Sequence, residues 1–548
     1  MPGDKGNLAT SYGCMGDVYK SQGRLVEALN WYQKGLTLQE QVVQERGTPG
    51  DKSSLAASYN CIAGVHKSQG RLDDALNWYQ KDCALSEQVV QERGTPGDKS
   101  DLAISYGCMG DVYRSQGRLV EALNWCQKYC SLLEQVVQER GMPGDKGNLA
   151  TSYGCMGDVY KSQGRLDEAL NWYQKSLALR EQVAEERGTP GDKSDLAISY
   201  SGIGDVYKSQ GRLDEALNWY QKDCALSEQV VQERGTPGDK SNLAISYGCM
   251  GDVYRSQGRL VEALNWYQKS LVLREQVVQE RGTPGDKSSL ATSYNCIADI
   301  HKSQGRLDDA LNWYQKGLTL QEQVVQERGT PGDKSSLAIS YGCIAGIYKS
   351  QGRLDEALNW YQKDCALSEQ VVQERGTPGD KSSLAASYNC IADIHKSQGR
   401  LDEALNWYQK DCALSEQVVQ ERGTPGDKSS LADSNYEIAY VYEKQGRYDK
   451  ALNLYRKVYE QAQQLNEWRT ALCCCVAAAD ILRKEERKAP QPKKTFLGIF
   501  KRKQEAPEES LQWIERGRAI LRRLMAEAET EQQRKEYAQK MIEFNKLW

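Results

Sequence analysis

The chain has 548 residues, of which 39% are apolar and three are Phe, and its formal net charge is −4. So few large apolar residues do not predict one large core. A charge this close to neutral argues against a general nucleic-acid binder, which would carry a strongly basic patch. The charge is uneven, however, because residues 481–548 hold 17 Lys and Arg against 11 Asp and Glu.

The tetrapeptide Pro-Gly-Asp-Lys recurs every 47 residues without slippage. An internal repeat of this length indicates a solenoid, in which each unit buries its apolar face against its neighbours. The repeat therefore overrides the several globular domains that the length alone would suggest. The motif begins at Pro2, Pro49, Pro96, Pro143, Pro190, Pro237, Pro284, Pro331, Pro378 and Pro425.

Each copy predicts two helices. In the first copy Gly23 is the natural C-cap of one helix. The next is predicted over 25–46, where Gly47 and Pro49 end it. The apolar residues of each helix return at helical spacing, so they share one face. They are Leu8, Tyr12, Met15 and Tyr19, and then Leu25, Ala28, Leu29, Tyr32 and Leu36.

This pattern resembles the tetratricopeptide repeat (TPR), which has a large, a small and an aromatic residue on one helix and a small and an aromatic residue on the next. The copies here have 47 residues instead of 34, which lengthens the second helix. In this respect the chain is similar to the arrays of kinesin light chains, of spindle-orientation adaptors and of some bacterial proteins. The matching residues are Tyr12, Met15, Gly16 and Tyr19, then Ala28 and Tyr32.

The resemblance implies an all-α fold, a right-handed TPR superhelix. We expect nine near-identical repeats in 2–424 and a divergent tenth in 425–464. An eleventh is expected in 465–526, interrupted by a basic, Pro-flanked insertion at 488–507. A helix in 527–548 would cap that end. At the other end the first helix would expose an apolar face, which favours a start inside a longer array.

The positions of the 17 cysteines do not indicate a disulfide-bonded scaffold. Cys83 and Cys224 stand where other copies carry Leu36 or Leu177, so they are interpreted as small buried hydrophobes. Their number then favours a reducing compartment. No signal peptide follows Met1, and the longest apolar run is too short to span a bilayer. We therefore expect a cytoplasmic protein.

Candidate catalytic groups are few, and the sequence predicts a protein that is not an enzyme and needs no cofactor or metal. His66, His301 and His395 occupy the position of the core residue Tyr19 and are interpreted as packing residues. Cys473, Cys474 and Cys475 are consecutive, and consecutive helical residues point about 100° apart. They could not ligate one ion together.

A binding function is better supported. First-helix positions that packing does not use hold an acidic residue and a basic residue three positions later. Each pair alone would be an intrahelical ion pair worth about a few tenths of a kcal/mol. Together they form a mixed-charge ladder suited to an extended or helical peptide, and the resemblance implies that it lines the concave face. The ladder residues are Asp17, Lys20, Lys67, Asp111, Arg114, Asp158, Lys161, Asp205, Lys208, Asp252, Arg255, Asp299, Lys302, Asp393 and Lys396.

The insertion is a second candidate contact, because it places aromatic and apolar residues between clusters of cations. It would dock on an acidic protein or on the solenoid itself, or sit at an anionic membrane, where each cation contributes about 1 kcal/mol. Its contact residues are Lys493, Lys494, Phe496, Leu497, Ile499, Phe500, Lys501, Arg502 and Lys503.

A row of tryptophans, one per near-identical repeat from Trp31 to Trp407, is the third candidate. Exposed rings could stack on proline-rich peptides, but packing between repeats is the preferred interpretation. The sequence as a whole favours an interaction scaffold for protein or peptide partners. The alternatives are a peripheral membrane adaptor tethered through 493–503 and the sensor arm of a larger protein. Nucleic acid is not an expected partner, and self-association is left open.

Overall fold

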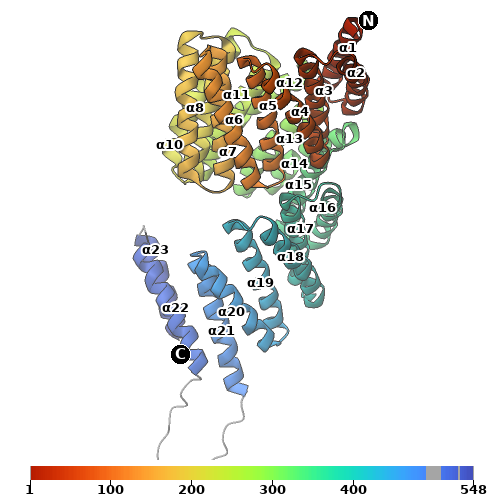
Figure 1. The fold of residues 1–548 in the computed structure, drawn as a ribbon. Coiled ribbons are helices and arrows are strands. Elements are labelled where there is room, and N and C mark those ends of the chain that lie inside the picture. Colours follow the sequence, from red (N-terminus) through yellow and green to blue (C-terminus); the bar gives the residue numbers. More distant parts are fainter. Residues whose placement is uncertain (1, 489–507, 529–530, 547–548) are drawn as a thin grey trace, which may run out of the picture. The chain divides into compact units, whose positions relative to one another are not determined.

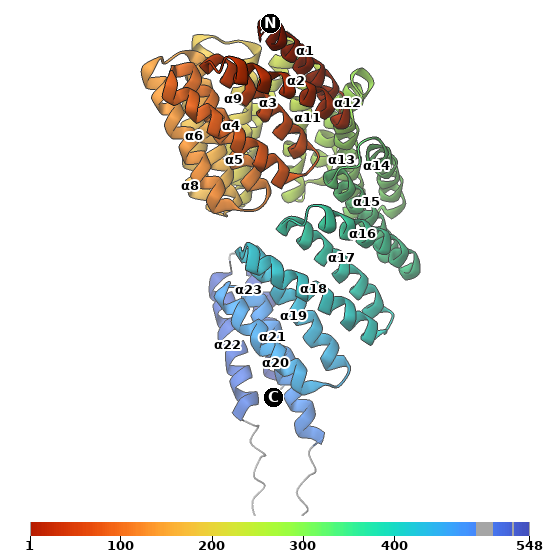
Figure 2. The same cartoon turned by 45° about the vertical axis from the view of Figure 1, so that its right-hand side comes forward.

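The computed structural model describes residues 2–488, 508–528 and 531–546. Within these ranges the chain forms 23 α-helices and no strand, and consecutive helices of the same compact unit pack side by side (Figures 1 and 2). The all-α fold of paired repeats is thus confirmed. The chain divides into two compact units, Met1–Asp380 and Lys381–Trp548.

The first helices of the pairs begin at the proline of Pro-Gly-Asp-Lys. They are α1 (Pro2–Ser21), α3 (Pro49–Ser68), α5 (Pro96–Ser115), α7 (Pro143–Ser162), α9 (Pro190–Ser209), α11 (Pro237–Ser256), α13 (Pro284–Ser303), α15 (Pro331–Ser350), α17 (Pro378–Ser397) and α19 (Pro425–Lys444).

The second helices start one residue after the arginine of the Gly-Arg turn. They are α2 (Leu25–Glu45), α4 (Leu72–Glu92), α6 (Leu119–Glu139), α8 (Leu166–Glu186), α10 (Leu213–Glu233), α12 (Leu260–Glu280), α14 (Leu307–Glu327), α16 (Leu354–Glu374), α18 (Leu401–Glu421) and α20 (Tyr448–Gln464). The chain continues with α21 (Trp468–Lys488), α22 (Glu508–Glu527) and α23 (Glu531–Lys546).

The boundary between repeats is a hydrogen-bonded helix start. The Thr95 hydroxyl accepts from the Asp98 backbone N–H at 3.2 Å, and the Asp98 carboxylate accepts from the Thr95 backbone N–H at 2.9 Å. Pro96 is the first helical residue, where its missing N–H costs nothing. Arg93, at the end of the preceding helix, donates to the same carboxylate at 2.9 Å. This capping box explains why each first helix begins at its proline.

The packing core of each repeat lies between its two helices and extends to the next pair. Ala28 and Tyr32 are buried in α2, and they share a cluster with Ile62 and Val65 of α3. A methyl group at Gly16 would come within 2.5 Å of the Tyr32 ring, so the glycine allows the two helices to approach closely. The clusters described for the near-identical repeats each join two successive repeats, as expected for a solenoid.

The cysteine and histidine interpretations are confirmed for these positions. Cys83 and Cys224 are buried, and burial raises the pKa of each thiol. His66, His301 and His395 are buried, and burial lowers the pKa of each imidazole. A histidine held in its neutral form inside a helix pair acts as a packing group.

The tryptophans are half-buried. The Trp219 ring lies 5.8 Å from the Tyr200 ring of its own repeat, and Lys222 covers it at 4.1 Å. Trp219 also packs against the cluster that joins α8 to α9. Trp219 therefore contributes to packing both within its repeat and between neighbouring repeats, with one part left exposed.

The described C-terminal helices α20 to α23 form one continuous core. Trp513 of α22 is 1% exposed, and Ser510 is fully buried. Cys474 and Cys475 of α21 are buried in the same cluster, whereas Cys473 is exposed, so the three thiols do not converge. In the described ranges no group of three potential ligands could hold a metal ion, and no helix is apolar over a length that would cross a membrane.

Candidate binding face of the first helices

The charge ladder lies on the last turns of the first helices, and its lysines pair across repeats. Lys161 Nζ lies 3.0 Å from Asp205 Oδ2, and Lys208 Nζ lies 2.9 Å from Asp252 Oδ2. The intrahelical pairing that the sequence suggested is therefore wrong for these lysines, because stacking brings the next repeat's carboxylate closer. Lys67 pairs with Asp111 in the same way.

The arginines of the ladder bridge both neighbours. Arg255 lies 3.4 Å from Asp252 in its own helix and 3.4 Å from Asp299 in the next first helix. Arg114 likewise contacts Asp111 at 2.6 Å and Asp158 at 3.7 Å. A guanidinium has five donors in a planar fork and can serve two carboxylates at once.

Six of the seven ladder aspartates also accept a hydrogen bond from a tyrosine of the second helix; the exception is Asp111, whose repeat has Cys126 in place of the tyrosine. The Tyr220 hydroxyl donates to Asp205 Oδ1 at 2.6 Å, and the Tyr267 hydroxyl donates to Asp252 Oδ1 at 2.6 Å. Burial and the adjacent carboxylate raise the pKa of both tyrosines. Similar tyrosine bonds reach Asp17, Asp158, Asp299 and Asp393.

The ladder is interrupted where Gly64 and Gly346 replace its aspartate. Lys20 and Lys302, which precede these glycines, form no ion pair with any residue that the structure describes. In the C-terminal unit Lys396 pairs with Asp393 at 2.9 Å and with Glu437 at 2.6 Å. Within the part of the chain that the structure describes, the ladder therefore combines paired charges with two cations, Lys20 and Lys302, that have no acidic partner.

Exposed isoleucines continue the same face toward the N-terminal end of four first helices, α5, α9, α11 and α15. They precede the ladder aspartate, or the glycine that replaces it, by seven residues, which is two helical turns and therefore the same face. The exposed fractions are 44% for Ile104, 54% for Ile198, 51% for Ile245 and 60% for Ile339. We name this surface, with the ladder, the first-helix face.

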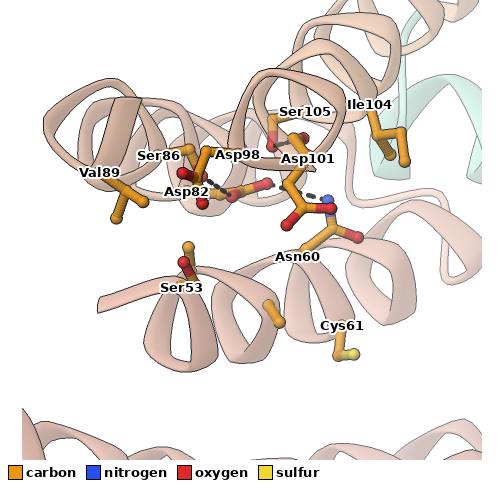
Figure 3. A pocket seen from close by; sticks show the side chains of 12 residues that line it. Ser53, Asn60, Cys61, Asp82, Ser86, Val89, Asp98, Asp101, Ile104 and Ser105 are labelled. Atoms are coloured by element: carbon orange, nitrogen blue, oxygen red, sulfur yellow. Dashed lines mark hydrogen bonds between the residues drawn. The ribbon is translucent and has the colours of Figure 1, made fainter. Parts of the chain in front are cut away.

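A cavity of about 250 Å³ opens between α3, α4 and α5 (Figure 3). Asp82 of α4 is at its base and is 2% exposed. Asn60 Nδ2 donates to Asp82 Oδ2 at 2.9 Å, and the Ser86 hydroxyl donates to Asp82 Oδ1 at 3.2 Å. Asp101 of α5 is exposed at the mouth.

Burial raises the pKa of Asp82, although the neighbouring hydrogen-bond donors partly offset this effect. The equivalent Asp223 of α10 has its pKa raised to about 6 for the same reason. These carboxylates contrast with Asp98, which also lines the cavity. Its pKa is lowered to about 2, chiefly because Arg93 donates to it.

A second cavity of about 270 Å³ repeats this arrangement in the C-terminal unit. Asp411 takes the place of Asp82, and Asn389 donates to it at 3.2 Å, as does Ser415. Asp433 of α19 is exposed at the mouth, one turn beyond the place of Asp101. Burial raises the pKa of Asp411, as it does for Asp82.

Sequence reasoning missed these two cavities. The signal was present, since Asp82 interrupts an otherwise apolar helix face between Tyr79 and Cys83. Whether such an aspartate is buried or solvated depends on helix stacking. The predicted contact residues of the insertion, Lys493 to Lys503, lie outside the described residues.

Family models of tetratricopeptide repeats match most of the chain. A model described as "MalT-like TPR region" matches residues 236–473. Two models described as "Tetratricopeptide repeat" match 101–182 and 148–229, and 8–47 and 55–94. The chain therefore belongs to the tetratricopeptide repeat proteins, as its motifs predicted.

Solved structures similar to the chain include BtubC (BKLC) from P. vanneervenii, with 16% identity over 53% of this chain and 98% of that chain and a TM-score of 0.35. The apo form of RapI matches at 12% identity over 76% and 99%, with a TM-score of 0.45. A Rap protein complexed with competence and sporulation factor has the same identity and coverage and a TM-score of 0.41. A comparison with curated proteins finds no match.

Proposed function

We propose that the chain is a non-enzymatic interaction scaffold that binds protein or peptide partners on its first-helix face. The observation that carries this proposal is the row of exposed isoleucines, Ile104, Ile198, Ile245 and Ile339, in line with half-buried charges. Single exposed apolar residues are ordinary on any surface. Recurrence at one position of the third, fifth, sixth and eighth first helices is different, because it places apolar contacts at intervals along one face, with polar residues between them.

The charges beside the isoleucines suit a peptide with its own acidic and basic residues. Lys20 and Lys302 present cations that have no acidic partner among the described residues, and the remaining pairs are accessible enough to exchange partners. An extended or helical peptide would bury isoleucines and form ion pairs along several repeats. Its affinity would then rise with the number of repeats engaged, through effective concentration.

The test is photo-crosslinking with benzoylphenylalanine on the first-helix face, followed by capture from the native host. Gly154 and Gly248 are suitable sites, because a Cβ there meets no atom within 4 Å. Asn171 and Asn265, exposed on second helices, are the controls. We expect one set of proteins to crosslink at the glycine sites and not at the asparagine sites.

A quadruple charge reversal at Lys20, Lys161, Lys208 and Lys302 to Glu should then reduce the captured amount about tenfold or more. Equal crosslinking from both helix faces would contradict the proposal. A variant that combines the four Lys→Glu changes with Ile→Asp at all four isoleucines should capture no partner. Undiminished capture by this variant would also contradict the proposal.

A further inference from the structure

We propose that the cavity between α3, α4 and α5, and its copy between α17, α18 and α19, each accept an arginine side chain of a bound peptide. This inference rests on the proposed function, since it assigns ligand chemistry to points on the first-helix face. Ala57 and Asn60 line the cavity from α3 and share a helix side with the ladder position, as their spacing requires.

The first argument is a buried carboxylate whose hydrogen-bonded partners are neutral. Asp82 is 2% exposed, and Asn60 and Ser86 donate to it. It forms no ion pair with any residue in the described ranges. A buried carboxylate without a cation is costly, so a cation that enters the cavity gains a strong interaction.

The second argument is that an arginine of the chain fills the equivalent groove in the fourth repeat. Arg180 stands at the position of Ser86 and is 9% exposed. Its guanidinium donates to the backbone carbonyl of Asp195 and lies 3.4 Å from the Thr151 hydroxyl. Asp195 and Thr151 are the equivalents of Asp101 and Ala57, which line the cavity.

The sixth repeat shows the same arrangement. Arg274 donates to the backbone carbonyl of Ser289, the equivalent of Asp101, at 2.7 Å. Its Nε lies 3.4 Å from the hydroxyl of Ser270, the equivalent of Asp82. The groove thus has the size and the acceptors for a guanidinium, and the cavity of α3, α4 and α5 adds carboxylates to them.

The third argument is that both cavities combine room with a second acid. Ala57 and Ala386 occupy the place where Thr151 approaches Arg180, and each leaves more space. Asp101 at one mouth and Asp433 at the other are exposed. A guanidinium between a buried and an exposed carboxylate could bond to both, which favours arginine over the point charge of lysine.

The experiment uses the full chain and three acetylated, amidated, fluorescein-labelled Gly-Ser peptides with two arginines, two lysines or two citrullines. Citrulline has nearly the shape of arginine without its charge. By fluorescence anisotropy in 0.15 M salt, we expect the arginine peptide to bind about tenfold more tightly than the citrulline peptide. The lysine peptide should be intermediate. Equal binding of the arginine and citrulline peptides would overturn the inference.

The matched variant D82S/S86R/D411S/S415R gives both repeats the serine and the arginine that the fourth repeat has at Ser176 and Arg180, so it should fold. It fills both cavities and should lose the preference for arginine. The control D223S/S227R makes the same change in the fifth repeat, where Ile198 replaces the cavity alanine. It should change affinity less than threefold, and circular dichroism verifies folding.

If the control loses as much affinity for the arginine peptide per replaced Asp-Ser pair as the matched variant does, the effect comes from overall charge alone. That result would overturn the inference. The proposed function has an independent readout in the crosslinks at Gly154 and Gly248. If the crosslinks persist in D82S/S86R/D411S/S415R while the unmodified chain binds the arginine and citrulline peptides equally, the scaffold proposal stands and the arginine site does not.

Discussion

The near-identical repeats and the C-terminal helices α20 to α23 are held together differently. In the repeats each interface buries a small apolar cluster, and polar groups such as Asp82, Ser86 and Asp223 are buried beside it. In α20 to α23 one apolar cluster extends from Tyr455 to Tyr537. The repeats distribute their stability over many interfaces, whereas the terminal helices depend on one core.

The turns and helix N-termini also differ between the near-identical repeats and the C-terminal helices. The near-identical repeats use a glycine turn, a threonine cap and an Arg-Asp bridge at almost every boundary, as in Thr95 and Asp98. Between α20 and α21 the turn uses Asn466 at φ 60° instead of glycine. Local hydrogen bonds thus define the repeats, and side-chain burial defines the terminal helices.

The largest effect is expected from Trp513→Ala. The ring is 1% exposed, and truncating a buried tryptophan costs about 3–5 kcal/mol of unfolding free energy. Trp219→Ala, at a half-buried ring of the repeats, should cost clearly less. Urea unfolding with hydrogen exchange of α21 and α22 measures both. Acrylamide should quench the fluorescence of Trp219 more than that of Trp513. Equal losses of unfolding free energy in the two variants would contradict the proposed difference between the two regions.

An intermediate effect, with a pH signature, is expected from Asp223→Asn. Burial raises the pKa of Asp223 to about 6, above about 4 in the unfolded chain. The folded state therefore holds the proton more tightly, and ionisation costs stability as pH rises from 4 through 6. The variant escapes this cost and should be more stable at pH 7.5 by up to roughly 2 kcal/mol, with no gain at pH 4.

Asp239→Asn is the control with the opposite sign. Arg234, donating to Asp239, is the main reason that the pKa of this capping carboxylate is lowered to about 2. Its stabilisation is present above pH 4 and is lost as pH falls toward 2. The variant should therefore be less stable at pH 7.5, and the deficit should shrink in acid. Parallel pH profiles of the two urea midpoints would contradict this assignment.

The smallest effect is expected from Met142→Thr. Met142 is the N-cap of α7 and forms no side-chain capping bond, although Asp145 still accepts from its backbone N–H at 3.1 Å. Restoring the threonine of the other boundaries should stabilise the fourth repeat by about 1 kcal/mol. Thr189→Met, at the start of α9, should cost a similar amount. The change in the urea midpoint checks both variants. An unchanged midpoint in both would contradict a stabilising role for the threonine N-cap.

The sequence by itself determined the helix pairs, their boundaries and the family. Helical spacing of Tyr12, Met15 and Tyr19 reports the buried face, and Gly23 and Pro49 report the turns, because these are local steric and hydrogen-bonding properties. Burial of His66 and Cys83 was also predictable, since each replaces a packing residue in a known position. The peptide contacts of the ladder and the binding role of Lys493 to Lys503 stay predictions.

Only the tertiary structure decided which charges meet. Lys161 and Asp205 are 44 residues apart, and nothing local shows that Lys161 prefers the next repeat to its own Asp158. Stacking also decided that Asp82 lies at the base of a cavity while Arg180 closes the equivalent groove. The physical reason is that burial and pairing of a polar side chain depend on the atoms of neighbouring helices, which the spacing within one helix does not specify.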